Sequence, residues 1–204
     1  MRWTKQAFDK DYYKAGARGG FKDYEYGHPD QQVQLQIKWD LIQNTYGNVG
    51  SILFIGCAQG FEVKYFRERG VRAFGVDVSE WAIENCEPEV RDFVAPYDGF
   101  NFPYQKQEFE VVAHFDVMAL IPQERRMEFI LNSTNLSSCA YYFRTHVANH
   151  REPFVFEEFN GIDGAFYTYW SLEKYVESVE FAGMQFKSAQ ISSCLLYTSD
   201  AADE

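Results

Sequence analysis

A glycine-bounded turn and a later aspartate carry the strongest chemical signal in the sequence. Gly56 and Gly60 lie between a short apolar run and a helical pattern, and Asp77, 77 − 56 = 21 positions after Gly56, ends the next apolar run. Glycine lets a ligand approach the backbone closely, and the first turn of a helix offers N–H groups to a carboxylate. An acid at the end of the following strand accepts hydrogen bonds from both hydroxyls of a ribose. The pattern therefore predicts a nucleoside site; the alternative is a tight turn and a capping aspartate with no ligand.

Strands and helices alternate around these residues. Apolar runs predict strands over 51–55, 71–78, 91–95, 109–115, 140–147 and 186–191. Three-four spacing, N-caps and glycine stops predict helices over 30–46, 61–69, 80–86 and 122–131, and one between Ser171 and Gly183. This alternation predicts an α/β fold, a doubly wound and mostly parallel sheet with helices on both faces. Ligands of such sheets bind beyond the carboxyl ends of the strands.

The segment 30–46 has two competing patterns. Val33, Ile37 and Leu41 fall four apart, as on one face of a helix, whereas Val33, Leu35 and Ile37 alternate, as in a strand. The length of the segment favours the helix, and Gly47 is expected to end it.

Composition limits the functions that are open to the chain. Its 204 residues fit one domain, and the net charge of −11 disfavours a nucleic-acid partner. No segment is apolar enough to span a membrane, and the N-terminus lacks the apolar run of a signal peptide, so no membrane partner and a cytoplasmic location are expected. No metal site is expected, because paired spacing is absent from the four cysteines, Cys57, Cys86, Cys139 and Cys194.

Two motifs in this region resemble a known family. Residues 56–61 read Gly-Cys-Ala-Gln-Gly-Phe, and residues 75–83 read Gly-Val-Asp-Val-Ser-Glu-Trp-Ala-Ile. They resemble the class I S-adenosylmethionine-dependent methyltransferases, and most closely a bacterial group with a GCAKGF…GVDISEYAI core that is linked to methylation of sugars and other small molecules. The resemblance implies a Rossmann-like sheet of order 3-2-1-4-5-7-6, the cofactor S-adenosyl-L-methionine and a small-molecule substrate.

The resemblance also assigns parts of the cofactor to residues. The glycines approach the methionine portion, Asp77 binds the ribose, and Val78 packs on the adenine face. Asp98 accepts a hydrogen bond from the adenine amino group, and the two residues after it offer backbone groups to the ring. The cofactor-binding residues implied in this way are Gly56, Cys57, Ala58, Gly60, Asp77, Val78, Asp98, Gly99 and Phe100.

Departures from the family pattern bear on catalysis. Phe54 stands where the family has an aspartate that helps to hold the methionine amino end, and Ala119-Leu120 replaces a Glu-His pair that faces the acceptor. Methyl transfer needs mainly proximity and alignment, but a hydroxyl acceptor also needs a general base. The candidates at strand ends are His114, Asp116 and His146.

Three functions remain open from the sequence. The first is methyl transfer to a small molecule, with a sugar hydroxyl as the candidate acceptor. The second is a degenerate domain that binds S-adenosylmethionine without turnover, which Phe54 and Ala119-Leu120 favour. The third is a nicotinamide-dependent dehydrogenase, which is disfavoured because Ala58 and Phe61 replace glycines of the dinucleotide-binding pattern.

The last eleven residues differ in character from the rest. Residues 194–204 resemble the translation of a transposon-end sequencing adapter, so the native chain is expected to continue past Ser193. Residues 1–193 are then expected to form a single methyltransferase domain, with an N-terminal arm and helix over 1–47 and the core over 48–193. The last strand of the family's sheet, which would lie between 140–147 and 186–191, is expected to be missing.

Overall fold

The computed structural model describes residues 8–13, 25–145, 147, 154–156 and 167–189. A five-stranded sheet has the order β3-β2-β1-β4-β5, and each neighbouring pair is parallel. Its strands are β1 Ser51–Ile55, β2 Arg72–Asp77, β3 Val94–Pro96, β4 Phe109–Phe115 and β5 Ser137–Arg144. The predicted Rossmann-like sheet is therefore confirmed, with β1 at its centre.

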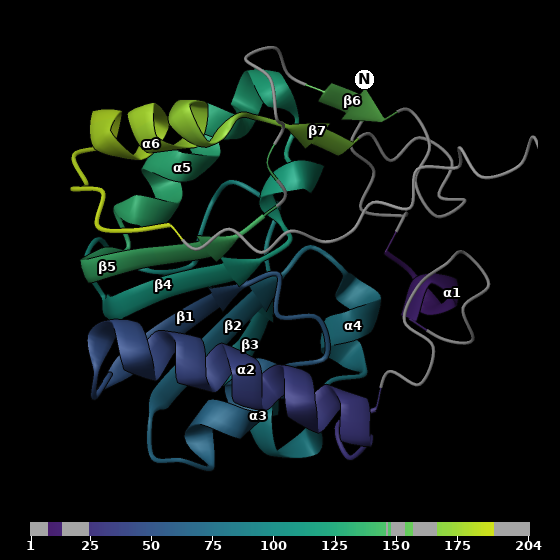
Figure 1. Ribbon diagram of the computed structural model, residues 1–204. Helices are drawn as coiled ribbons and strands as arrows, with labels where there is room; N and C mark the ends of the chain where they lie inside the picture. The colour runs from purple at the N-terminus through teal and green to yellow at the C-terminus, as the bar shows by residue number, and fades with distance from the viewer. Residues whose placement is uncertain (1–7, 14–24, 146, 148–153, 157–166, 190–204) are drawn as a thin grey trace, which may run out of the picture.

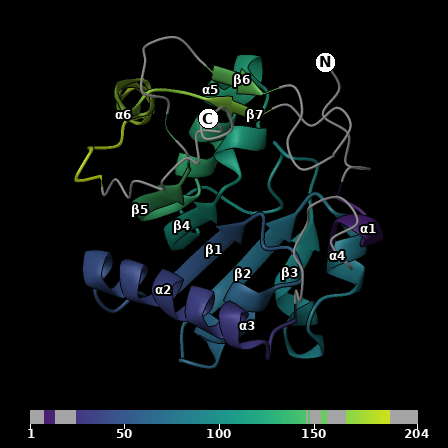
Figure 2. The same ribbon diagram turned by 45° about the vertical axis from the view of Figure 1, so that its right-hand side comes forward.

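Helices cover both faces of this sheet. Figure 1 shows α2 and α3 on one face and α5 and α6 on the other, and Figure 2 shows the same two layers after rotation. Short 3₁₀ helices cover 88–93, 118–120 and 123–125, and β6 (Phe154–Phe156) pairs with β7 (Tyr167–Tyr169) in an antiparallel ribbon. The α-helices are α1 Lys10–Tyr13, α2 Pro29–Tyr46, α3 Phe61–Arg67, α4 Glu80–Glu84, α5 Arg126–Thr134 and α6 Leu172–Phe181.

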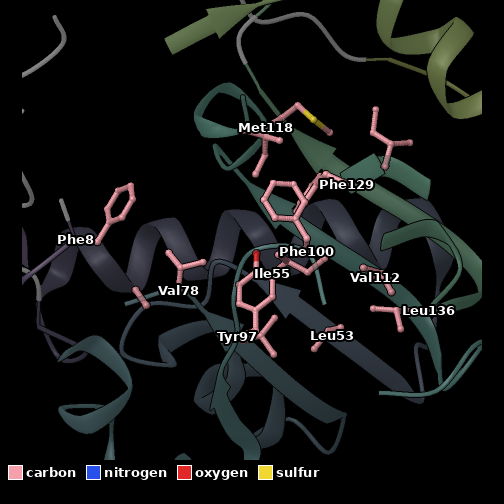
Figure 3. Packing of buried hydrophobic residues seen from close by; sticks show 14 of the residues in the cluster. Phe8, Leu53, Ile55, Val78, Tyr97, Phe100, Val112, Met118, Phe129 and Leu136 are labelled. Carbon is pink, nitrogen blue, oxygen red and sulfur yellow. The ribbon is translucent and has the colours of Figure 1, made fainter. Parts of the chain in front are cut away.

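Alternation along β1 divides the core into two apolar layers. Leu53 and Ile55 pack with Phe129 of α5 and Tyr175 of α6, and Figure 3 shows ten labelled side chains of this cluster. Residues 52 and 54 point to the other face, where the cluster includes α2 and α3. Successive side chains of a strand face opposite sides, so the four consecutive apolar residues 52–55 of this central strand support both layers. All five residues of β1 are buried.

Capping residues fix the helices that lead away from the sheet. Ser79 accepts a hydrogen bond from the amide of Ala82 and so begins α4, as predicted. Ser171 does the same for α6 through the amide of Lys174. Gly47 follows α2 with φ of 72°, which ends that helix where the sequence predicts.

Several predicted boundaries are wrong. The strand predicted over 91–95 is short, because Pro88 begins a 3₁₀ helix that runs to Phe93 and only 94–96 pair with β2. The fifth strand begins at Ser137 and ends at Arg144, three residues earlier than predicted. Pro122 precedes a 3₁₀ turn, and the α-helix itself begins at Arg126.

The predicted apolar face of α2 is also wrong. Val33 and Ile37 are 55% and 42% exposed, whereas Leu35 and Ile42 are buried. Either set of residues could form the buried face of a helix. Packing against β1 and α3 buries the set that contains Leu35 and Ile42.

The predicted strand at 186–191 is not present over 186–189, which carry no regular structure. Residues 190–191 and the adapter-like tail lie outside the described part of the chain. Among the described residues, no helix is long and apolar enough to cross a membrane.

Candidate functional site

The glycine turn joins the end of β1 to the start of α3. Gly56 and Gly60 have φ of 75° and 78°, in the left-handed region that favours glycine. A side chain on Gly56 would collide with Val117, and a Cβ on Gly60 would lie 2.9 Å from Val90 Cγ2. The sequence pattern therefore reflects two real backbone requirements, one conformational and one steric.

Asp77 connects this turn to the end of β2. Its carboxylate accepts a hydrogen bond from the amide of Ala58 at 2.7 Å and another from the amide of Ser79 at 2.8 Å. The residue is 4% exposed. Burial raises the pKa of Asp77 from 3.8 to about 6, against the two amides, which lower it. A carboxylate at this place holds the turn in register and keeps lone pairs for a ligand, since each oxygen has two.

Most amides of the turn are already in use. The amides of Gly56 and Cys57 both donate to the carbonyl of Val76, at 2.8 and 3.1 Å, and the Gly60 amide donates to the Cys57 carbonyl at 2.8 Å. Together with the Ala58 amide, four N–H groups of the turn are engaged by the protein. The sequence predicts that N–H groups of this segment donate to a carboxylate of the ligand. These four amides do not fit that prediction, because each already donates to the protein.

Cys57 points away from the nucleoside side. Its side chain is 1% exposed and belongs to the apolar cluster of α2 and α3, where its sulfur would block any side chain on Gly75. Burial raises the pKa of the Cys57 thiol well above its usual value. The thiol is therefore uncharged and packs in the core, and only the backbone of Cys57 lies along the predicted site.

Apolar side chains predicted for the adenine region lie in one cluster. Val78 and Phe100 belong to the same buried group as Ala58, and Figure 3 shows Val78 and Phe100 with Phe8 of the N-terminal arm. The Ser79 hydroxyl donates to the Phe8 carbonyl, which ties the arm to the start of α4.

Asp98 is organised by the residues that follow it. Its Oδ1 accepts from the amides of Phe100 and Asn101, at 2.8 and 2.7 Å, and Asp98 itself is exposed. Gly99 has φ of 99°, which makes this tight turn possible. The Phe100 amide is thereby engaged, and the Phe100 carbonyl accepts from Asn132 Nδ2 at 3.1 Å. The carboxylate of Asp98 has the exposure that a contact with an adenine amino group requires, whereas the predicted backbone groups of Phe100 are shared with the protein.

At the carboxyl ends of β4 and β5, Asp116 and Arg144 form a bidentate ion pair. Arg144 Nη2 and Nε lie 2.5 and 3.4 Å from the two carboxylate oxygens of Asp116. Asp116 has φ of 62°, an uncommon conformation outside glycine that costs about 1 kcal/mol or more. Both side chains are nearly half exposed, so the pair is accessible to an acceptor.

His114, one of the predicted bases, lies in the core. The residue is 0% exposed, its ring stacks on Phe143, and its Nε2 lies 2.7 Å from the Tyr141 hydroxyl. Burial lowers the pKa of His114 from 6.5 to about 3. These surroundings suit a neutral ring in the core more than a base that exchanges protons with an acceptor. His146 lies outside the described residues.

The remaining departures from the family pattern are apolar packing. Phe54 is 2% exposed and meets Phe66 edge-to-face, with ring centroids 4.9 Å apart. Ala119 is 2% exposed, in the 3₁₀ helix after β4, and Leu120 is half-buried beside the cluster of α5 and α6. None of the three side chains can hold a polar group of a ligand.

Sequence reasoning missed a charged pair on the same face as Phe54. Lys38 of α2 forms an ion pair with Glu62 of α3, and their side chains are only 14% and 11% exposed. No sequence pattern pointed to Lys38, because it lies between Leu35 and Ile42, the buried positions of α2, and the predicted face of that helix was a different one.

Comparison with known proteins identifies this arrangement. Residues 53–132, which contain the glycine turn, Asp77, Asp98 and Asp116, match the family model described as Methyltransferase domain. Over these 80 of its 204 residues, the chain is similar to methyltransferase domains. No curated protein sequence matches it.

Solved structures share the fold at low sequence identity, and several of them are methyltransferases. A protein from Pyrococcus horikoshii OT3, PH0226, has a TM-score of 0.62 at 14% identity, over 79% of this chain and 90% of that one. The 1,6-didemethyltoxoflavin-N1-methyltransferase of Burkholderia thailandensis, solved with 1,6-didemethyltoxoflavin and S-adenosylhomocysteine, has a TM-score of 0.62 at 13% identity, over 79% and 72%. An S-adenosylmethionine-dependent methyltransferase from Mesorhizobium loti has a TM-score of 0.56 at 13% identity, over 72% and 80%. At such identities the likeness establishes the fold, and the domain match adds the enzyme class.

The residues of the site fit S-adenosyl-L-methionine. Asp77 is a buried hydrogen-bond acceptor at the carboxyl end of β2, and a side chain on Gly56 would collide with Val117. Within the described residues, Glu62 Oε2 is a buried oxygen with no hydrogen-bond partner. A buried carboxylate beside the glycine turn, together with an acid that has one oxygen without a donor, fits a nucleoside with a cationic amino-acid end.

Proposed function

We propose that this protein transfers the methyl group of S-adenosyl-L-methionine to a small-molecule acceptor, and that the acceptor group is a hydroxyl such as that of a sugar. One observation carries the proposal. Asp77, at the carboxyl end of β2, is buried against the glycine turn, and its carboxylate bridges that turn to the start of α4. This arrangement, within a methyltransferase domain, supports nucleoside binding beyond the carboxyl ends of β1 and β2.

The chain's residues would bind the cofactor along this edge. Asp77 accepts hydrogen bonds from the ribose hydroxyls, and Val78 packs against the adenine. Asp98 accepts from the adenine amino group, beside Gly99 and Phe100. The backbone of Gly56, Cys57, Ala58 and Gly60 lines the path towards the sulfonium.

Catalysis would rest on alignment and on one carboxylate. The sulfonium of S-adenosyl-L-methionine supplies a methyl group bonded to an excellent leaving group. The protein holds the acceptor oxygen in line with that methyl group, and Asp116 takes the hydroxyl proton as the carbon–oxygen bond forms. Arg144 holds the Asp116 carboxylate through two N–H donors, which fixes the direction of its lone pairs. Asp116 fits this role better than His114 because it is accessible.

The experiment is a binding titration followed by a transfer assay. S-adenosylhomocysteine and NAD are titrated calorimetrically, and radiolabelled S-adenosyl-L-methionine is then incubated with a panel of sugars, nucleotide sugars and other hydroxylated metabolites. We expect binding of S-adenosylhomocysteine, no binding of NAD, and label transfer that is lost in Asp116→Asn. Absence of S-adenosylhomocysteine binding would overturn the proposal.

A second candidate is a degenerate domain that binds the cofactor without turnover. The apolar packing of Phe54 and Ala119, where the family pattern has polar residues, favours it. The same experiment separates the two candidates, because the degenerate domain binds S-adenosylhomocysteine but transfers no label to any acceptor. We also propose that nucleic acid is not a partner of this protein, because its net charge is −11.

A further inference from the structure

A largely buried ion pair on the face of α2 and α3 lies beside the carboxyl ends of two neighbouring strands, β1 and β4. Lys38 Nζ contacts Glu62 Oε1, and the same ammonium lies 4.9 Å from the centre of the Phe115 ring, at the end of β4. Glu62 follows Phe61, the first residue of α3, at the end of the turn that joins β1 to that helix. The pair therefore lies beside the carboxyl ends of β1 and β4, at the edge where ligands of such sheets bind.

Structural roles account for the pair only in part. Glu62 lies in the first turn of α3, where the helix dipole favours an acid, and Lys38 joins α2 to α3. A buried ion pair is nevertheless a weak source of stability, because both charges lose water. Among the described residues, no group donates to Glu62 Oε2, although the residue is only 8% exposed. Buried polar atoms normally have a hydrogen-bond partner. A ligand bound at this edge of the sheet would supply the donor that Glu62 Oε2 lacks.

We propose that Lys38 and Glu62 bind the amino-acid end of S-adenosyl-L-methionine, with Lys38 on its carboxylate and Glu62 Oε2 on its ammonium. An α-amino acid carries its two charges on neighbouring groups, so an ion pair whose charges are in contact matches both at once. The inference rests on the proposed function and adds two binding residues to it.

Two neighbouring observations explain why this task falls to the helices. Phe54, the β1 residue on the same face, is packed against Phe66 and offers no acceptor. The amides of Gly56, Cys57, Ala58 and Gly60 are engaged by the protein, so the turn has few donors left for a carboxylate. Glu62 lies on the same face of α3 as Phe66, which is four residues later and contacts Phe54. Glu62 therefore places a carboxylate on the side of the sheet where β1 has none.

The test compares two ligands that differ in this end alone. S-adenosylhomocysteine carries the amino-acid end, and 5′-methylthioadenosine has the same nucleoside and sulfur without it. Affinities of both are measured by calorimetry for the wild type, for Glu62→Gln, and for the double variant Lys38→Met/Glu62→Gln, which removes both charges and so avoids an unpaired buried ion.

A second ion pair on α3 provides the matched control. Lys64 and Glu87 lie 2.7 Å apart with side chains 14% and 25% exposed, and Lys64 also contacts Glu89. The control is Lys64→Met/Glu87→Gln, which makes the same chemical changes in an ion pair that also has one member on α3.

We expect Glu62→Gln to weaken S-adenosylhomocysteine about tenfold or more while 5′-methylthioadenosine changes less than about twofold. The double variant should do the same, and the control should change neither affinity. Equal weakening of both ligands, or unchanged S-adenosylhomocysteine affinity in a folded variant, would overturn the inference. A wild type that binds neither ligand would overturn the proposed function itself, so the two failures are distinguishable.

Discussion

Replacing Asp77 by asparagine should change how stability depends on pH. Burial raises the pKa of Asp77 to about 6, above the value of 3.8 that it has when exposed. The folded state therefore binds more protons than the unfolded state between these values, and stability falls as pH rises through the window from about 4 to 6. At about 1.4 kcal/mol per pKa unit, the wild type loses about 3 kcal/mol across that window from this one group.

The asparagine variant has no such titration. Its side chain has one acceptor oxygen for two backbone donors, the amides of Ala58 and Ser79, so one amide loses its partner at about 1–3 kcal/mol. That cost is present at every pH. The difference in unfolding free energy, variant minus wild type, should thus become more favourable to the variant by about 3 kcal/mol between pH 4 and pH 7.

Urea unfolding of both proteins without cofactor, followed by circular dichroism at pH 4, 5, 6 and 7, measures this difference. Other groups that titrate in the range, such as His114, are common to both proteins and cancel. A difference that stays flat across the four pH values would refute the reasoning that Asp77 is held in an unfavourable buried state.

The same carboxylate links pH to binding. Ribose hydroxyls donate to the ionised form of Asp77, so wild-type affinity for S-adenosylhomocysteine should fall as pH drops below about 6. The variant should bind at least about tenfold more weakly at pH 7, since hydrogen bonds to a charged acceptor are each worth about 1.5–3 kcal/mol. Calorimetric titration at pH 5.5 and 7.5 measures the pH dependence of the wild-type affinity and the ratio of the two proteins' affinities. Equal affinities of wild type and variant would show that Asp77 does not bind the ligand.

Three further substitutions test the packing around the site. Gly56→Ala should lower the melting temperature more than Gly183→Ala, because both glycines have positive φ but only a Cβ on Gly56 would collide with a side chain, that of Val117. Equal falls in melting temperature would contradict the steric argument. Phe54→Asp should cost about 3–5 kcal/mol in urea unfolding and bring no gain in S-adenosylhomocysteine affinity, since it exchanges a buried ring for a charge; a folded variant that binds more tightly would show the opposite. His114→Phe should flatten the loss of stability on acidification from pH 6.5, because burial lowers the His114 pKa to about 3 and the unfolded chain takes up the proton first; a pH profile unchanged from wild type would count against this.

Local patterns were enough to predict the centre of the fold. The strands 51–55 and 109–115 have the predicted bounds, because both are buried runs with clear turn residues around them. The glycine turn and Asp77 were also predictable, since their spacing is fixed by one strand, one helix and the next strand.

Boundaries were less predictable where polar residues take part in structure. β5 begins with Ser137, whose hydroxyl donates to the carbonyls of Glu110 and Ala140 and so replaces an apolar contact at the start of the strand. The apolar pattern predicts that this strand begins at Ala140, because the three residues before it, 137–139, are two serines and a cysteine. Similarly, the buried face of α2 is selected by packing, and its sequence fits two faces about equally well.

Contacts between distant elements were the part of the site that sequence patterns missed. Lys38 and Glu62 are 24 residues apart, and Asp116 and Arg144 are 28 apart. Each pair forms because two elements pack together, α2 with α3 and β4 with β5, and no local spacing encodes that. His114 was misleading for the same reason, since its place at the end of a strand gave no sign that α5 covers it.

The charges of the proposed site complement those of the methyl donor. S-adenosyl-L-methionine carries a sulfonium, an ammonium and a carboxylate, and is therefore a monocation, whereas the product S-adenosylhomocysteine lacks the sulfonium charge. The buried charges of the site, Asp77, Glu62 and Lys38, together carry one net negative charge once Asp77 is ionised; Asp98 is exposed to solvent, and the Asp116–Arg144 pair adds no net charge. In a buried setting such a match favours the donor over the product by electrostatics alone. Loss of the sulfonium charge on transfer leaves the site with an unbalanced negative charge, which promotes release of the product. The raised pKa of Asp77 limits the cost of this imbalance, because the carboxyl can take up a proton when the site is empty.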